Sequence, residues 1–197
     1  IVALPRVFNL SKREADMAIA VSRPEAGRLT VQKLTDYRLH LAAHRDYLAA
    51  HPPIHSPEDL RVHRMVGYIP DMIFDKELDY LTTVGAPPVA LASNSVSVQL
   101  NWLRAAAGGG VVHDFALPAA PELVKVIPDQ VSLSRSFWLI RHEDDGRVAR
   151  LNRFADLFDL IKDLQHYYKP FVQAMPKLPK RTNSYFEVLQ KQDILLH

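Results

Sequence analysis

The sequence predicts an α/β fold with mostly parallel sheets and flanking helices. The strongest sign is the stretch 87–116, where a short apolar run, a polar turn, an apolar-periodic segment, three glycines and a second apolar run follow one another. This order is typical of a strand, a helix and a second strand. Elsewhere, other short apolar runs alternate with helical segments, which favours a parallel sheet covered by helices. A chain of 197 residues, 48% of them hydrophobic, can bury such a core.

The rest of the chain predicts further strands and helices in the same alternation. Strands are expected at 1–4, 16–21, 29–34, 37–43, 65–69, 123–127 and 136–141, and helices at 45–51, from Ser56 onward and after 144–146. Ser56 is a good N-cap residue, and Pro57 suits the first position of a helix. Residues 74–83 are ambiguous between a strand and irregular structure. The segment 167–197 is expected to be an extension of unknown role.

The turn Ser93–Asn94–Ser95 consists of good helix N-cap residues. Behind it Val96, Leu100 and Leu103 recur at helical spacing, so they are expected to face the core. Gly108–Gly110 are expected to end this helix, since glycine adopts the left-handed geometry of a C-terminal cap without steric cost. Hydroxyls, an amide and free N–H groups at a helix N-terminus favour binding of a small anion.

The overall composition excludes several classes of function. The net charge is only +2, which encodes no strong attraction to nucleic acid. The chain has no cysteine, which excludes disulfides, a cysteine nucleophile and cysteine-bound zinc. No apolar run is long enough to span a membrane, and the N-terminus lacks a signal-peptide pattern, so no membrane partner is expected.

No pattern in the sequence predicts an enzyme. The nine histidines lack the spacing of metal ligands, so no metal site is expected. The three glycines follow a helix rather than open one, and no Gly-Lys-Ser/Thr is present, so no phosphate loop and no cofactor are expected. His113 and Asp114 lie just after the start of a predicted strand, where a ligand-lining or structural role is favoured over catalysis.

The helix after Ser95 carries a second apolar stripe, formed by Val98, Trp102 and Ala105. A helix that is apolar on two sides is either fully buried or packed against another subunit. Exposed apolar stripes of this kind mark interaction surfaces in many proteins. We favour a subunit interface at these three residues, with simple burial as the alternative.

Several segments occur in an order that resembles the effector-binding domain of LysR-type transcriptional regulators. They are Asn9–Ile19 (Asn-Leu-Ser-Lys-Arg-Glu-Ala-Asp-Met-Ala-Ile), the strand through Tyr37 with Tyr47-Leu48 after it, the turn Ser93–Ser95 with its helix, Ala106–Val111 (Ala-Ala-Gly-Gly-Gly-Val), and Phe137–Ile140 before a long helix. The resemblance covers about residues 1–165. Its most specific parts are the Arg-Glu-Ala-Asp-Met-Ala-Ile segment and the glycine turn.

This resemblance implies a two-lobed fold like that of type 2 periplasmic binding proteins, with a small-molecule cleft between the lobes. Lobe I would comprise 1–37 and 137–166, and lobe II 38–136. The resemblance further implies a cytoplasmic regulator that forms homodimers or tetramers and binds DNA through an N-terminal helix-turn-helix that this chain does not contain. The first strand and helix of lobe I also have no counterpart, so the chain is expected to be N-terminally truncated.

By position, the resemblance implies eight residues that contact the effector. They are Leu4, Pro5, Ser22, Tyr68, Ser93, Asn94, Ser95 and His113. The hydroxyls and the helix N-terminus favour a carboxylate or another small polar anion as the effector. A solute-binding protein of the same fold is the alternative, and a helix-turn-helix encoded upstream would distinguish the two.

Overall fold

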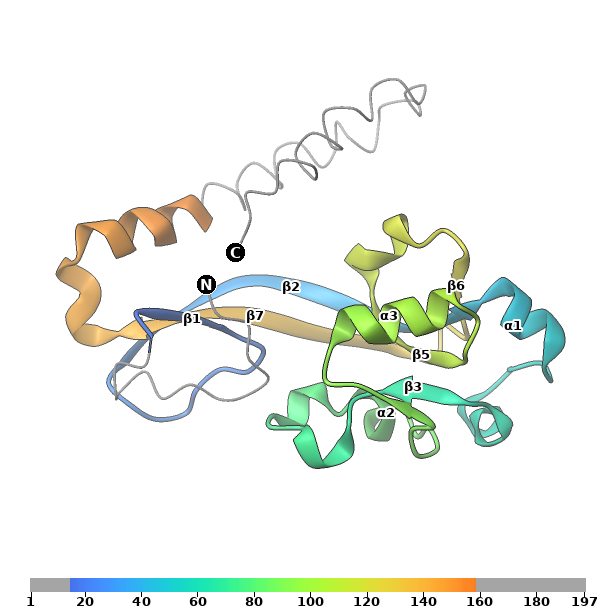
Figure 1. Cartoon of the computed structure of the whole chain (residues 1–197). Helices are drawn as coiled ribbons and strands as arrows, with labels where there is room; N and C mark the ends of the chain where they lie inside the picture. The colour runs from blue at the N-terminus through green and yellow to red at the C-terminus, as the bar shows by residue number, and fades with distance from the viewer. Residues whose placement is uncertain (1–14, 159–197) are drawn as a thin grey trace, which may run out of the picture.

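The computed structural model of the protein describes residues 15–158, which form a mixed α/β structure built around one long sheet (Figure 1). Within these residues the sheet has seven strands in the order β1-β7-β2-β5-β3-β4, and β6 also pairs with β2. The strands are β1 Met17–Ala20, β2 Leu29–His44, β3 Met65–Gly67, β4 Leu91–Ala92, β5 Gly109–His113, β6 Leu123–Lys125 and β7 Ser132–His142. The strand expected at 1–4 and the extension 167–197 lie outside the described residues.

Short helices connect most of the strands. The α-helices are α1 Arg45–Ala50, α2 Tyr80–Thr83 and α3 Val96–Arg104, and a further helix begins at 149 and continues to the last described residue. The 3₁₀ helices are η2 Pro57–Val62, η3 Pro70–Met72, η4 Lys76–Leu78, η5 Asp114–Ala119 and η6 Glu143–Arg147. The helix start predicted at Ser56 is present, where the Asp59 carboxylate accepts hydrogen bonds from the His55 and Ser56 N–H groups.

Two long strands, β2 and β7, run side by side through the whole molecule (Figure 1). They pair antiparallel from Leu29 opposite His142 to His40 opposite Ser132. The two extended runs expected at 29–34 and 37–43 are therefore one strand. A register shift between Lys33 and Thr35 separates them, which changes the face to which the following side chains point.

The predicted α/β class with flanking helices is confirmed, but the mostly parallel pairing is wrong. Only β3 pairs in parallel, with β4 on one side and β5 on the other. All pairs that involve β2 or β7 are antiparallel. Parallel strands need a crossover connection. The helix α3 lies in the connection from β4 to β5, the two strands on either side of β3. The two long strands, β2 and β7, instead run in opposite directions as direct neighbours.

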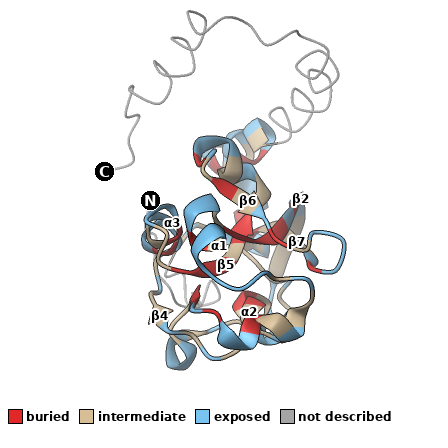
Figure 2. Ribbon diagram, turned by 90° about the vertical axis from the view of Figure 1, so that its right-hand side faces the viewer, coloured by how far each residue is buried: buried red, intermediate tan, exposed pale blue. Residues whose placement is uncertain are grey.

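The sheet joins two packed regions. The β1 region consists of β1, residues 29–34 and 137–142 of the two long strands, and the helix from 149, which lies over them (Figure 1). Its core is the cluster Leu34, Leu139 and Ala155. The β3–β6 region consists of residues 38–136. Its buried residues gather on the central strands, with α3 and α2 on opposite faces of the sheet (Figures 1 and 2).

The glycines after α3 have a different role from the one predicted. The residue in left-handed geometry is Ala106, with φ of 56°, whereas none of the three glycines has positive φ. A Cβ atom on Gly108 would lie 2.3 Å from the Arg64 carbonyl oxygen, and one on Gly110 would lie 2.7 Å from that of Val66. Gly108 and Gly110 are therefore needed because the chain here approaches the backbone of residues 64–66 too closely for a side chain.

The buried face of α3 is also rotated from the predicted one. Leu103 is buried as expected, but Val96 is 40% exposed and Gln99 is buried in its place. The reason is a polar contact: the Gln99 side chain turns inward and donates a hydrogen bond to the Ser93 carbonyl oxygen at 2.6 Å. Hydrophobic periodicity alone gives no signal for such a contact.

Candidate functional site

The candidate site is centred on Tyr37, which lies in β2 where the long strands pass from one region to the other. Its side chain is only 7% exposed. The Tyr37 ring stacks on Phe137 of β7 with 4.3 Å between ring centroids, and on His113 of β5 with 5.4 Å. Stacked rings of this kind are worth about 0.5–1.5 kcal/mol each beyond their buried area. Neighbours on two other strands therefore hold the Tyr37 ring in place.

Further aromatic rings extend this stack. Tyr80 of α2 meets the His113 ring edge-on at 6.2 Å, and Tyr68 meets Tyr80 at 6.0 Å. Phe115 of η5 lies 4.9 Å from His113 and is exposed. We call the set the aromatic cluster; it comprises Tyr37, Tyr68, Tyr80, His113, Phe115 and Phe137. The cluster lies where the two regions meet.

Two hydroxyl groups in the aromatic cluster lack hydrogen bonds. Within the described part of the chain, the buried hydroxyl oxygens of Tyr37 and Tyr80 have no partner; they interact with each other without reaching hydrogen-bond geometry. Burial raises the pKa of Tyr37 and of Tyr80, and it raises the pKa of Tyr68 to about 12, so all three hydroxyls stay protonated. An unpaired buried polar group costs about 1–3 kcal/mol. Such a cost is tolerated most often at functional sites.

The end of β5 is held in place by a polar network on Asp114. The Asp114 carboxylate contacts the His40 Nδ1 atom at 2.7 Å and accepts a hydrogen bond from Lys125 Nζ at 2.8 Å. Burial opposes ionisation of Asp114, but these two hydrogen bonds outweigh it and lower its pKa. Burial lowers the pKa of His113. His113 therefore presents a neutral ring to the site rather than a cation.

The loop after β1 contacts the opposite region. The Ser22 hydroxyl donates a hydrogen bond to the Asp75 carboxylate, and Val21 packs against the aromatic cluster. Asp75 is itself anchored, because its other carboxylate oxygen accepts a hydrogen bond from the Glu77 N–H at 2.9 Å and so caps η4. A hydrogen-bonded and apolar contact thus joins the β1 region to the β3–β6 region beside Tyr37.

The turn Ser93–Ser95 is used in part by the fold itself. The Ser95 hydroxyl caps α3 by accepting from the Val98 N–H at 3.5 Å, and the Ser93 hydroxyl accepts from the Ser95 N–H at 3.1 Å. The Ser93 N–H donates to the Gly67 carbonyl oxygen at 3.0 Å, which ties the turn to the end of β3 beside Tyr68. Asn94 is exposed at the tip of the turn.

The structure brings three of the eight predicted site residues to the aromatic cluster. Tyr68 and His113 belong to the aromatic cluster, and Ser22 lies in the loop that packs against it. Leu4 and Pro5 lie outside the described residues. Sequence reasoning missed Tyr37, Tyr80 and Asp75. No sequence signal marks Asp75 or Tyr80, because both fall in the ambiguous stretch 74–83. For Tyr37 the sequence indicates only a position in a strand.

The described residues give no sign of a metal centre or of a membrane anchor. Between residues 15 and 158, no three His, Cys, Asp or Glu side chains are grouped so that they could bind a metal ion. In the same residues, no helix has the length and hydropathy needed to cross a lipid bilayer.

Comparison with known proteins identifies the class of protein. Residues 5–159 match the family model described as the LysR substrate binding domain. The match covers more than half of the chain, so the chain belongs to the LysR substrate-binding domain family. It is an effector-sensing regulatory domain of a transcription regulator. No match was found among the curated proteins.

Solved structures show the same fold. The regulatory domain of CrgA, a LysR-type transcriptional regulator from Neisseria meningitidis, has a TM-score of 0.65 and 22% sequence identity, over 76% of each chain. The regulatory domain of MetR, a LysR family regulator from the same organism, has a TM-score of 0.58 and 19% identity, over 76% of this chain and 73% of that one. A second structure of CrgA is longer than the regulatory domain alone, and this chain spans 53% of its length.

Proposed function

We propose that the aromatic cluster and the loop after β1 form the binding site of a small-molecule effector. The β1 region and the β3–β6 region would be the two lobes, with boundaries at 1–37, 38–136 and 137–166. The observation that carries this proposal is the contact of Val21 and Ser22 with the opposite region beside two buried tyrosine hydroxyls that lack partners. Buried polar groups that converge in an apolar setting are typical of ligand sites.

The effector would contact residues from both regions. Tyr68 and His113 would supply aromatic surface, Ser22 a hydroxyl, and Ser93–Ser95 a polar turn at the N-terminus of α3. Leu4 and Pro5 would complete the site from the start of the chain. The positive end of the α3 dipole favours a carboxylate or another small anion at the turn.

Effector binding would change how the two regions are placed. A ligand shifts a conformational equilibrium only through contacts that differ between the two states. The contact of Ser22 with Asp75 joins the two regions, so it is one such contact. Closure around the effector would move the subunits and, with them, the DNA-binding helix-turn-helix of the intact regulator. The proposal includes a cytoplasmic location and no catalytic activity.

Assembly into a homodimer or tetramer would use the outer face of α3. Val98 is 39% exposed and Ala105 is exposed, whereas Trp102 is half-buried and packs partly on the core. Val98→Glu is expected to shift the protein toward monomer in sedimentation velocity runs, because it places a charge in an apolar interface. Ser97→Glu, at an exposed neighbour on the same helix, is the control. An unchanged assembly state in the Val98 variant would show that α3 does not form the subunit interface.

The effector site itself can be tested by ligand screening followed by titration. A compound that raises the melting temperature of the chain would be titrated calorimetrically into Ser22→Ala and Asn94→Ala variants. Each is expected to bind it about tenfold more weakly, as for the loss of one hydrogen bond to a charged group. Ser97→Ala is the matched control and is expected to bind normally. Normal affinity in both site variants would contradict the assignment.

A further inference from the structure

A cavity of about 630 Å³ lies within the β3–β6 region. All of its lining residues fall between positions 66 and 111, so the β1 region contributes nothing to it. Its walls are β3, the segment from η3 to α2, the proline-rich stretch before β4, and one residue each of α3 and β5. The volume is in the range of small-molecule sites, which run from about 300 to 1,000 Å³.

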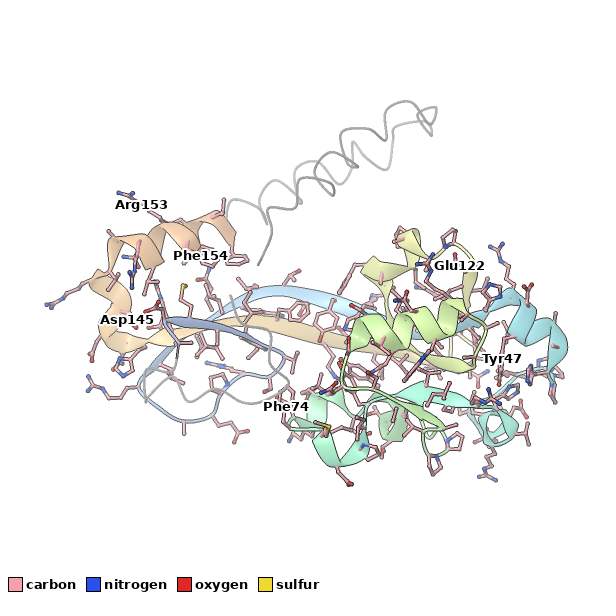
Figure 3. The ribbon with its side chains drawn as sticks, in the orientation of Figure 1. Tyr47, Phe74, Glu122, Asp145, Arg153 and Phe154 are labelled. Carbon is pink, nitrogen blue, oxygen red and sulfur yellow. The ribbon has the colours of Figure 1, made fainter. Side chains whose placement is uncertain are left out.

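Most of the cavity wall is apolar. Tyr68 and Tyr80 present aromatic rings to it, and Pro87 closes another side. Phe74 also lines the cavity while 40% of its side chain is exposed, on the side of the β3–β6 region that faces the β1 region (Figure 3). An exposed aromatic ring at a cavity indicates an apolar ligand body.

Two opposite charges lie on the same wall. Lys76 and Asp79 both line the cavity, and they form no ion pair with each other. Among the described residues Lys76 has no carboxylate partner. The Asp79 carboxylate caps α2 by accepting a hydrogen bond from the Thr82 N–H at 3.3 Å, and within residues 15–158 no cation pairs with it. The cavity therefore offers one positive and one negative group to a ligand.

The amide of Gln99 completes the polar part of the wall. Gln99 lines the cavity and is 8% exposed. Its Nε2 atom donates to the Ser93 carbonyl oxygen at 2.6 Å, which fixes the orientation of the amide. Its Oε1 atom accepts no hydrogen bond from the described residues. A ligand that donates an N–H group would satisfy this oxygen.

We propose that this cavity binds an α-amino acid with an apolar side chain. Lys76 matches the carboxylate, Asp79 and Gln99 match the ammonium group, and the tyrosine and proline walls match the side chain. A simple carboxylate would leave Asp79 and Gln99 unmatched, and a simple amine would leave Lys76 unmatched. The cavity shares the Tyr68 and Tyr80 rings with the effector site proposed above, but its charged groups, Lys76 and Asp79, lie outside that site and can be tested without it.

Three probes of one carbon skeleton test the proposal. L-leucine carries both charges, isocaproate lacks the ammonium group and isoamylamine lacks the carboxylate. In calorimetric titrations of the whole chain, L-leucine is expected to bind at least about tenfold more tightly than either analogue, because each analogue loses a charge-assisted contact. Equal affinity for all three probes, or no binding of L-leucine up to its solubility limit, would overturn the proposal.

Variants then locate the site. Lys76→Met is expected to reduce L-leucine affinity to about that of the amine, and Asp79→Asn to about that of the carboxylate, since asparagine keeps the oxygen that caps α2. Lys33→Met and Asp71→Asn change charge by the same amount at positions outside the cavity, and both should bind normally. If Ser22→Ala lowers the affinity for L-leucine and the Lys76 and Asp79 variants do not, the amino acid binds beside Ser22. That result would contradict binding in the cavity.

Discussion

Two buried tyrosines, Tyr37 and Tyr47, stand in similar surroundings but differ in their hydrogen bonds. Each ring stacks on a histidine: Tyr37 on His113 at 5.4 Å, and Tyr47 on His51 at 3.9 Å. Tyr47 lies at the end of the molecule far from the β1 region (Figure 3). Its hydroxyl accepts from the Arg64 N–H at 3.0 Å and lies 3.3 Å from His63 Nδ1. The Tyr37 hydroxyl has no partner in residues 15–158.

The difference separates a structural tyrosine from a candidate ligand contact. The Tyr47 hydroxyl links α1 to the segment before β3, so the fold itself uses its hydrogen-bonding capacity. The Tyr37 hydroxyl has no partner in hydrogen-bond geometry within residues 15–158, interacts with the Tyr80 hydroxyl, and carries a desolvation cost. Because nearly all buried polar groups in proteins are satisfied, an exception beside a contact between two regions points to a partner that binds there.

The largest expected effect is that of Tyr47→Phe. The change removes two hydrogen bonds and leaves the Arg64 N–H without its buried partner, so we expect a loss of about 1–3 kcal/mol in the free energy of unfolding. Urea unfolding followed by circular dichroism measures it. A loss below the error of that measurement would mean that the Tyr47 hydroxyl, like that of Tyr37, does not contribute to the free energy of unfolding.

The contact between the regions should have the next largest effect. Asp75→Ala removes the η4 cap together with the contact to Ser22, and caps are worth about 0.5–2 kcal/mol. Ser22→Ala removes only the contact between regions and should cost less, about 0.5–1.5 kcal/mol. Urea unfolding of both variants gives the two values. A Ser22→Ala loss as large as that of Asp75→Ala would show that the cap contributes little.

The pH dependence of stability should reflect the histidines that contact the two tyrosines, His63 beside Tyr47 and His113 beside Tyr37. Burial and the nearby His51 lower the pKa of His63, and burial lowers that of His113. The unfolded chain therefore binds protons more readily than the folded one, so stability is complete above about pH 6.5 and falls as the pH drops below it. We expect the melting temperature to decrease between about pH 7.5 and 5.5.

Single substitutions would assign this pH dependence. His113→Phe keeps an aromatic ring against Tyr37 and should make the fall in melting temperature shallower. His55→Gln, at an exposed position, is the matched control for the loss of one histidine. A His113→Phe profile identical to that of the unaltered chain would show that His113 titrates alike in the folded and unfolded states.

The smallest stability effect is expected for Tyr37→Phe. Removing a hydroxyl that has no partner removes its desolvation cost, so the free energy of unfolding should change by less than about 0.5 kcal/mol or rise slightly. Effector affinity should nevertheless fall, which urea unfolding and calorimetric titration of the same variant would show together. A stability loss as large as that of Tyr47→Phe would reveal a hydrogen bond from the Tyr37 hydroxyl within the fold.

Local sequence signals predicted many elements of the fold but not how the strands pair. Ser95 caps α3, and Ser56 precedes η2, because capping depends on a few adjacent residues. The long strand β2 was read as two runs, since the register shift after Lys33 breaks the hydrophobic pattern. Whether neighbouring strands run parallel depends on contacts distant in sequence, which no local pattern records.

The candidate site could be predicted only where a residue follows a recognisable element. Tyr68 lies at the end of a predicted strand, Ser22 follows another, and the Ser93–Ser95 turn precedes a predicted helix. Asp75 and Tyr80 lie in a stretch without clear periodicity, so only their packing against the opposite region and the aromatic cluster reveals them. Likewise the glycines after α3 were recognised as necessary, but the reason, contact with β3, is a property of the folded sheet.

By itself the sequence determined the α/β class, the membership in a family of regulatory domains, the absence of cysteine chemistry, and the local helix starts. These depend on composition and on short-range residue patterns. The tertiary structure alone decided which polar groups remain unpaired. Within residues 15–158 the Tyr37 and Tyr80 hydroxyls have no partner in hydrogen-bond geometry, and these two side chains meet only when distant segments pack. Lys76 and Asp79 are close in sequence, but the cavity that both of them line forms only in the folded chain. Hydrogen bonds and charges are satisfied in three dimensions, and a sequence pattern does not show which of them are left over.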